Sequence, residues 1–504
     1  MSGENVAKMQ RGIVDRISEL PEFILHTILS MLDTKEACRA SVLSKRWFAA
    51  WSSIPVLDFR PQYIKEFEPR RYDDDMVKRF VGFIDMIMER YITRKYRITE
   101  LYLMLPEVDG KIESLVDKWI TFVVQNQIQK LEIWIISETK YRLPEILFSA
   151  KSLKVLAGIG VMLPFYETMG LVSLEYLILS METVDDNMLQ RIVSSCPLVE
   201  LDITYKNCLN RISLPWMKEV NGGIESCGSG MMQSSLKASQ LQKLKFVCRG
   251  DLSKELPWPC NMNVVALKNL RKLELRFVPI TDDVISKLSH GLVVLESLVI
   301  WKCFMLKCIN ISSNSLKQLR ITDNSGLEKA TIDAPKLLEF LCSCEVDTSL
   351  SLIQALDHCD AEFYPLCPGL VHAVWFINLK KFLTKANVFK SVEIKRLTFP
   401  GIGIEEDQLR NVGTGAPYKL RELKLLNPAK YSLVAFLNGL FWCCHPDVLS
   451  MSTDLQAAKL ILSILKEKAE CCEDSLKSVE VESMECPRLL SHSSVVETRL
   501  RLSW

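Results

Sequence analysis

Residues 15 to 59 read DRISELPEFILHTILSMLDTKEACRASVLSKRWFAAWSSIPVLDF, and their first part predicts an amphipathic helix. Pro21 suits a first helical position, because its fixed φ fits the first turn and its missing N–H would have no partner there. Apolar residues then recur at three- and four-residue steps, the spacing of one helix face: Ile24, Leu25, Ile28, Leu29 and Leu32. The stripe covers about three turns.

Two further short helices are predicted behind the first. Asp33 or Thr34 can cap the second helix, which continues through Val42. Ser44 can cap the third, which carries Trp47 and ends before the next proline. So short a segment cannot enclose a core of its own, so its apolar faces need a partner surface. That surface is either the following domain of the same chain or another protein.

The order of residues in this segment resembles the plant F-box motif. The resemblance rests on Leu-Pro at 20, the run ILHTILSML, Asp-Thr-Lys at 33, the run SVLSKRW and Leu-Asp-Phe at 57. It implies a helical module that docks on the Skp-type adaptor of a cullin-based ubiquitin ligase. The residues that the resemblance assigns to the adaptor interface, or to the small core beneath it, are Leu20, Pro21, Ile24, Leu25, Ile28, Leu29, Val42, Leu43 and Trp47. Sequence does not divide these two roles.

Composition indicates a globular chain without a bias toward polyanionic partners. Hydrophobic residues make up 48% and charged residues 24% of the 504 residues, and 62 Lys and Arg nearly cancel 61 Asp and Glu. We therefore expect neither nucleic acid nor a membrane as the main partner. No signal peptide or long apolar run is visible, and 17 cysteines, an odd number, favour free thiols. These features predict a cytoplasmic or nuclear protein.

A short pattern, apolar-x-x-apolar-x-apolar, recurs from residue 98 onward at spacings typical of leucine-rich repeats. Each repeat would place one inward side chain at the centre of a short strand. The predicted central residues are Leu101, Leu131, Leu156, Leu177, Leu201, Leu244, Leu273, Leu298, Leu319, Phe340, Leu397, Leu423 and Val479. The pieces between them differ, since 183–197 and 280–291 look helical whereas 310–315 does not. The pattern therefore predicts an irregular solenoid, similar to the degenerate repeats of plant F-box proteins.

The domain organisation follows from these segments. We expect a disordered N-terminus at 1–14, the F-box at 15–59, a connector at 60–97 with a helix near 76–92, and the repeats at 98–430. Residues 205–240 and 344–390 interrupt the repeats. The segment 431–504 resembles the C-terminal FBD segment of the same plant families in LNGLFWCCHPDVLS and CCEDSLKSVEVES, with an amphipathic helix between them. It is expected to be a helical cap on the solenoid. The predicted fold class is α/β.

Catalytic chemistry has one candidate in this sequence. Cys443 and Cys444 precede His445, and a Cys-His pair can form a thiolate nucleophile, although sequence adjacency does not bring the side chains into contact. The six histidines form none of the usual metal-binding spacings, and the Gly-rich segments lack nucleotide-loop spacing. We therefore expect no metal, no cofactor and no catalytic residue.

The predicted function is substrate recognition within an SCF-type ubiquitin ligase, without bond chemistry in this chain. Alternatives are a small-molecule receptor of similar layout, like plant hormone receptors, and a Cys/His hydrolase. Residues that alternate with the inward leucines point outward from the strands, and they are candidates for binding a protein target. The candidates are Trp134, Tyr176, Lys243, Lys245, Lys272 and Arg320.

Overall fold

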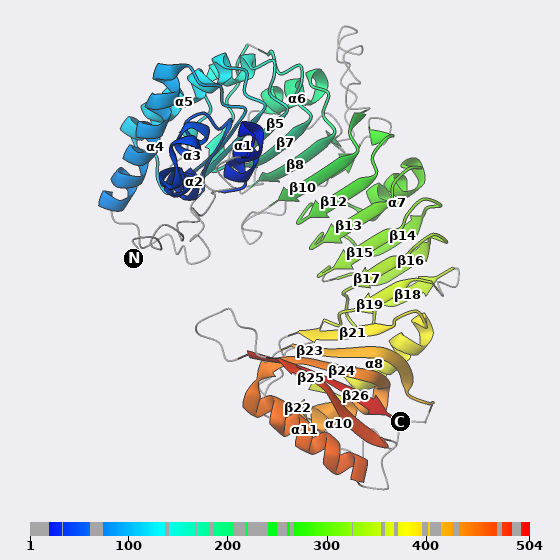
Figure 1. Cartoon of the computed structure of the whole chain (residues 1–504). Coiled ribbons are helices and arrows are strands. Elements are labelled where there is room, and N and C mark those ends of the chain that lie inside the picture. The colour runs from blue at the N-terminus through cyan, green and yellow to red at the C-terminus, as the bar shows by residue number, and fades with distance from the viewer. Residues whose placement is uncertain are drawn as a thin grey trace, which may run out of the picture. The chain divides into compact units, whose positions relative to one another are not determined.

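The computed structural model contains two compact units, residues 1–207 with 234–238, and residues 208–233 with 239–504 (Figure 1). We describe each unit by itself. The residues that the structure describes are 20–32, 34–60, 74–136, 141–167, 169–181, 186–205, 217–219, 240–248, 260–262, 267–324, 326–353, 358–366, 371–395, 402–403, 415–426, 433–470, 476–485 and 495–504.

The first unit begins with the three predicted helices, shown in dark blue in Figure 1. They are α1 (Glu22–Ser30), α2 (Thr34–Ala40) and α3 (Lys45–Trp51), with a 3-10 turn η1 (Ser41–Leu43) before α3. Pro21 is the N-cap and not the first helical residue, because its ψ of 146° is extended while its carbonyl accepts the first helical bonds. Val42 lies in the 3-10 turn, so the second helix is shorter than predicted. Ser44 caps α3 as predicted, its side chain accepting the backbone N–H of Trp47.

A parallel sheet follows in the first unit. Its strands, in spatial order, are β1 (Val56–Phe59), β2 (Glu100–Leu105), β3 (Lys130–Ile135), β5 (Val155–Ile159), β7 (Tyr176–Met181) and β8 (Glu200–Tyr205). One register aligns the buried residues Leu57, Leu101, Leu131, Leu156, Leu177 and Leu201. Five of these were predicted. Leu57 was missed, because its strand lies within the range expected for the F-box.

Helices of different length and type cross the back of this sheet. The 30 residues from Leu101 to Leu131 hold α5 (Gly110–Gln125), whereas shorter repeats hold the 3-10 helix η3 (Glu145–Ser149) or α6 (Asp186–Ser195). The expected connector helix is α4 (Asp74–Arg94). Two short strands, β4 (Tyr141–Arg142) and β6 (Val161–Met162), pair with each other. Gly158 breaks the apolar pattern because a Cβ there would lie 2.7 Å from a methyl of Val161.

The second unit continues the same repeat pattern. Its parallel strands are β10 (Lys243–Cys248), β12 (Lys272–Arg276), β13 (Ser297–Trp301), β15 (Gln318–Thr322), β17 (Glu339–Cys342) and β19 (Asp360–Phe363). Their aligned central residues are Leu244, Leu273, Leu298, Leu319, Phe340 and Ala361. A short antiparallel pair, β9 (Met217–Glu219) and β11 (Cys260–Met262), also belongs to this unit.

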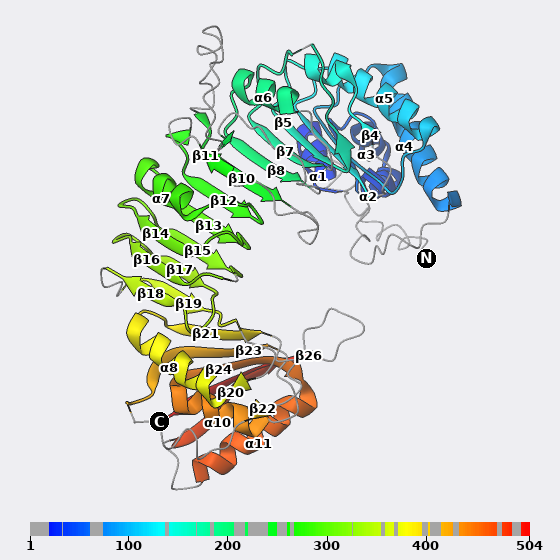
Figure 2. The ribbon, with the colours of Figure 1, turned by 180° about the vertical axis from the view of Figure 1, so that it is seen from behind.

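In the second unit, the element on the back of a described repeat follows the repeat's length. The 25 residues from Leu273 to Leu298 include α7 (Asp282–Gly291), as predicted. The next repeats have 21 residues, and extended chain spans the same distance with fewer residues than a helix. They accordingly carry the strands β14 (Cys308–Ser312), β16 (Lys329–Asp333) and β18 (Ser349–Leu352). These three form a second parallel sheet beside the sheet of β12, β13, β15, β17 and β19 in the same unit (Figures 1 and 2). The segment 310–315 is non-helical, as predicted.

The C-terminal part extends the sheet and then reverses its direction. Strands β21 (Ser391–Lys395), β23 (Tyr418–Leu426) and β24 (Cys444–Asp454) are parallel, and β20 (Val371–His372) pairs with β22 (Ile402–Gly403). Strand β26 (Val495–Ser503) runs antiparallel to β24 and to β25 (Ser478–Glu485). The predicted repeat at Val479 is therefore wrong, because β25 is not in the parallel series. The predicted residue Leu397 lies outside the described residues, and Val392 faces Leu423 instead.

Three helices cover this C-terminal part (Figure 2). They are α8 (Ala373–Ala386), α10 (Leu433–Cys443) and α11 (Leu455–Glu470). Helix α10 packs on α8, and α11 packs on β24, β25 and β26. The helical cap expected over 431–504 thus contains α10 and α11, and in addition β24, β25 and β26, of which only β25 had been expected as a strand, at Val479.

Candidate functional site

The structure divides the predicted adaptor-binding residues into a core and a surface. Leu25 and Leu29 are fully buried, and Trp47 is 5% exposed. Leu20, Ile24 and Ile28 are half-buried, and Pro21 is exposed. Val42 and Leu43, at 84% and 66% exposure, project from the 3-10 turn. The buried three support the helices, whereas the exposed residues are free to meet another molecule.

Three more exposed apolar side chains lie on the same elements: Phe23 (65%) and Met31 (82%) on or beside α1, and Phe48 (55%) on α3. Sequence reasoning did not assign them to the interface. The signal for Phe23 was present, because it falls outside the apolar stripe of its helix. We call Pro21, Phe23, Met31, Val42, Leu43 and Phe48 the F-box apolar surface. Helix α3 packs on both α1 and η1, so this surface spans neighbouring elements.

The three helices are fixed to the rest of the first unit by buried contacts. The Tyr91 hydroxyl donates to the Ile54 carbonyl at 3.0 Å, and burial raises the pKa of Tyr91 to about 12. The Arg90 guanidinium lies 3.8 Å from the centre of the Trp51 ring. The backbone N–H of Asp58 donates to the buried Thr34 hydroxyl at 2.7 Å. These contacts join the helices to β1 and α4, and the F-box apolar surface stays outside them.

The exposed strand face of the first unit carries a network of charged and aromatic groups. Arg60 donates to the Asp58 carboxylate at 2.7 Å and to Glu132 at 3.2 Å. Its guanidinium lies 4.2 Å from the Tyr102 ring centre and 6.0 Å from the ring centre of Trp134. The hydrogen bond to Asp58 raises the pKa of Arg60. Sequence reasoning proposed Trp134 as a contact residue but did not reveal this network, since the network depends on strand register.

The six residues predicted to contact a target all lie on the exposed sides of strands. The register places Lys243 of β10 directly opposite Lys272 of β12. It does not bring together Trp134 and Tyr176, because Tyr176 faces Val155. The remaining candidates are Lys245 on β10 and Arg320 on β15, whose guanidinium lies 3.9 Å from Glu339. Their role in target binding remains a prediction.

The Cys-His candidate does not form a nucleophilic pair. The Cys443 and Cys444 thiols are buried, and they donate to the carbonyls of Phe376 (3.1 Å) and Leu440 (3.4 Å). Burial raises the pKa of Cys443 well above its usual value and that of Cys444 to about 12, so both stay protonated at neutral pH. The His445 ring stacks on Trp504 at 3.9 Å instead. These thiols are packing groups.

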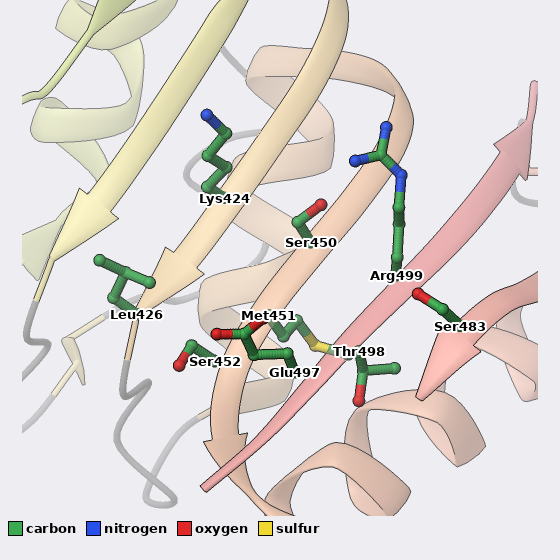
Figure 3. Close-up of a pocket in the computed structure, with 9 residues that line it drawn as sticks. All are labelled: Lys424, Leu426, Ser450, Met451, Ser452, Ser483, Glu497, Thr498 and Arg499. Carbon is green, nitrogen blue, oxygen red and sulfur yellow. The ribbon is translucent and has the colours of Figure 1, made fainter. Parts of the chain in front are cut away.

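A pocket of about 300 Å³ opens among β23, β24, β25 and β26. Figure 3 shows Lys424, Ser450 and Arg499 extending from three of these strands. Its cations already have carboxylate partners: Lys424 lies 3.3 Å from Glu362, and Arg499 lies 3.3 Å from Glu422. Glu422 also accepts the Ser450 hydroxyl at 2.6 Å. These two cations are therefore paired with carboxylates of the same chain, and the arrangement contains no activated nucleophile.

Three general properties of the described residues are relevant to function. Ten of their cysteines are free thiols, and eight of these ten are buried, in agreement with the expectation from sequence. Within the same residues, His, Cys, Asp and Glu form no group of three or more suited to a metal ion. None of the helices described is both long and apolar enough to cross a membrane.

Comparison with known proteins matches two segments of the chain to protein families. The F-box domain family matches residues 17–59, the segment that forms α1 to α3 and β1. This chain is a plant F-box protein with a leucine-rich-repeat domain. The repeat match is to the family described as At1g61320/AtMIF1, LRR domain, over residues 257–375. In this F-box protein, that range contains the strands from β12 to β19.

Curated relatives come from Arabidopsis thaliana. The putative F-box/LRR-repeat protein At3g18150 is 31% identical over 39% of this chain and 38% of its own length. The F-box/LRR-repeat protein At3g58900 is 27% identical over 53% of this chain and 80% of its own length. The FBD-associated F-box protein At4g13985 is 31% identical over 41% of this chain and 45% of its own length. The chain spans about two fifths to three fifths of the first three relatives it matches.

Proposed function

We propose that this F-box protein is the substrate-recognition subunit of an SCF-type ubiquitin ligase. Its F-box would bind a Skp-type adaptor, and through it a cullin, and its repeats would bind a protein target. One observation carries the proposal: the segment that matches the F-box family leaves six apolar residues on its outer side. Val42 is 84% exposed and Met31 is 82% exposed. Apolar side chains so exposed favour a protein interface.

The division between core and surface gives each F-box residue a proposed role. Leu25, Leu29 and Trp47 hold the helices together, because they are buried within the first unit. Val42 and Leu43 contact the adaptor. Charged residues accompany this surface, as Lys45 and Arg46 lie between Leu43 and Phe48 in sequence. Such charges favour orientation and association rate more than final affinity.

The chain itself would carry out no bond chemistry. Its contribution is proximity, because a target held near the ubiquitin-carrying enzyme meets it at a high local concentration. We also propose residues 15–59 as the F-box, 60–97 as connector, 98–430 as the repeat solenoid and 431–504 as an FBD-like cap. A cytoplasmic or nuclear location suits this function.

Affinity capture tests the proposal with a point variant. Deleting residues 1–60 would also remove β1, whose Leu57 and Phe59 are buried in the sheet. We therefore choose Val42→Asp with Leu43→Asp, which changes only exposed positions. The control is Val172→Asp, at a residue of the same unit that is 63% exposed.

We expect intact protein and the control to retain the adaptor and cullin, as identified by mass spectrometry, and the double variant to lose both. Partners retained by all three are candidate targets. Equal recovery of the adaptor with the double variant would refute the proposed interface.

A further inference from the structure

A cluster of aromatic and charged side chains lies where β12, β13 and β15 end. The Trp301 ring is 4.8 Å from the Arg276 guanidinium and 5.0 Å from the Phe277 ring, which meets it edge to face. The Lys302 ammonium lies 5.5 Å from both ring centres. The Trp301 indole N–H donates to Asp323 at 2.8 Å. We call these five residues the Trp301 platform.

The backbone builds this platform through one repeated conformation. Phe277, Lys302 and Asp323 each follow a strand end, and their φ angles are 57°, 52° and 53°. A side chain with positive φ costs roughly 1 kcal/mol or more, so three consecutive repeats accept strain at the same position. The N–H of Phe277 donates to the Trp301 carbonyl, and the N–H of Lys302 donates to that of Thr322. The strained turn therefore stacks these side chains along one edge of the sheet.

The platform has charges that are fixed and charges that are available. Arg276 forms an ion pair with Glu274. Asp323 is occupied by the Trp301 N–H and, at 3.4 Å, by the Ser343 hydroxyl. Lys302 is exposed, and no carboxylate among the described residues forms an ion pair with it. An incoming group would therefore meet an aromatic surface beside an available cation.

Charge is distributed unevenly along the exposed strand face of this unit. On β10, β12, β13 and β15 and the described residues that directly follow them, six cations stand against two carboxylates: Lys243, Lys245, Lys272, Arg276, Lys302 and Arg320 against Glu274 and Asp323. On the next two strands, β17 and β19, all the charged residues are carboxylates: Glu339, Asp360 and Glu362. On β21 and β23 both signs occur, Glu393 and Glu422 beside Lys395, Lys419, Arg421 and Lys424. The face thus changes from basic to acidic between β15 and β17.

We propose that the strand face from β10 to β15 binds an acidic segment of the target protein, with an aromatic or aliphatic side chain of that segment on the Trp301 platform. This inference rests on the proposed function, since it names the class of target for the repeats. Carboxylates of the segment would pair with Lys272 and Lys302 by charge complementarity. Trp and Arg at the centre of the contact are residue types that dominate binding energy at protein interfaces.

A single-stranded nucleic acid also uses cations and aromatic rings, but the neighbouring strands disfavour it. A phosphate chain continuing past β15 would meet Glu339, Asp360 and Glu362. A peptide can change its own charge at that point, whereas a phosphate backbone cannot. The acidic strands therefore favour a polypeptide.

The test uses the purified full chain, with a displayed library of random dodecapeptides as probe. Selected peptides are labelled with fluorescein, and their affinities are measured by anisotropy at low and high salt. The variants are Lys302→Glu and Trp301→Ala. The control is Lys287→Glu, an exposed lysine on α7 that undergoes the same charge change away from the strand face. A single-stranded oligouridylate is measured in parallel.

We expect the selected peptides to carry net negative charge with an aromatic or aliphatic residue. Lys302→Glu should weaken their binding roughly tenfold, high salt should weaken it further, and Lys287→Glu should leave it unchanged. Trp301→Ala should also weaken peptide binding. If Trp301→Ala unfolds the protein, the result with Lys302→Glu still decides the test. Neutral or basic selected peptides, affinities insensitive to Lys302→Glu, or tighter binding of oligouridylate at this face would each overturn the inference. Adaptor capture by the same preparations tests the proposed function separately.

Discussion

The packing of α10 on α8 depends on Gly439, and we expect Gly439→Ala to destabilise the C-terminal part of the chain. A Cβ at Gly439 would lie 2.6 Å from two ring atoms of Phe376 and 2.8 Å from a third. Phe376 is fully buried, with the rings of Trp375 at 5.1 Å and Phe436 at 5.7 Å. The ring would have to retreat by roughly 1 Å, and its neighbours leave it no free direction.

Two effects of opposite sign decide how much Gly439→Ala changes the free energy of unfolding. Alanine in a helix interior is favoured over glycine by about 1 kcal/mol. Overpacking a well-filled core costs about 1–3 kcal/mol, and contact with three atoms of a buried ring belongs to the upper part of this range. We therefore expect a net loss of about 1–2 kcal/mol in the free energy of unfolding. Gly82 in α4 is the matched control, because its Cβ would meet nothing within 4 Å, and Gly82→Ala should stabilise by about 0.5–1 kcal/mol.

Hydrogen exchange read by mass spectrometry reports the stability of each helix separately, which suits a chain with two units. Gly439→Ala should speed exchange in α8 and α10, and Gly82→Ala should slow it in α4. Combining Gly439→Ala with Phe376→Leu should cost less than the sum of the two single changes, since the smaller side chain relieves the contact. Stabilisation of α10 by Gly439→Ala would refute this account of the packing.

Three further predictions concern the repeats of the second unit. Asn324→Leu should lower the free energy of unfolding by about 1–3 kcal/mol, because the buried amide oxygen accepts the Cys303 N–H at 2.7 Å; unchanged urea unfolding would contradict this. Leu298→Ala should cost about 2–5 kcal/mol, whereas Lys272→Ala should cost less than about 0.5 kcal/mol; similar losses in urea would contradict the strand register. Iodoacetamide should label the exposed Cys308 in the native protein but leave Cys303 unlabelled until denaturation, since burial raises the pKa of Cys303 to about 12; peptide mass spectrometry decides.

Much of the repeat architecture could be read from the sequence because its cause is local. The recurring apolar-x-x-apolar-x-apolar pattern predicted the central residue of eleven strands that the structure aligns, ten of them leucines and one Phe340. Helices α6 and α7 were predicted for a similar reason, since each begins beside acidic residues suited to a first turn. These signals depend only on spacing and on side-chain type.

Strands that lack the repeat leucine, or that lie outside the predicted repeats, could not be found in this way. Ala361 is the central residue of β19, and alanine alone does not mark a strand. Leu57 belongs to a strand within residues 15–59, which the resemblance had assigned to the F-box and not to the repeats. The reversal that pairs β26 with β24 is a long-range contact, and no local pattern specified that the C-terminal strands would run antiparallel.

The candidate sites show the same limit. Val42 and Trp47 are both apolar residues in a predicted helical segment, yet one is 84% exposed and the other 5%. The difference arises from which side of α3 and η1 packs on the rest of the unit. The Trp301 platform likewise depends on the register that places Arg276 beside Trp301, and on the positive φ of Phe277. Neither is visible in the sequence.

The most direct test of the central claim is the affinity of the purified chain for a purified plant Skp-type adaptor, measured by surface plasmon resonance. Replacing an apolar contact at the centre of an interface costs about 2 kcal/mol or more, which corresponds to roughly thirtyfold in Kd. The account predicts at least this loss for Val42→Asp with Leu43→Asp and an unchanged Kd for Val172→Asp. Equal affinity of the double variant and the unmodified chain, with both folded, would contradict the assignment of this surface to the adaptor.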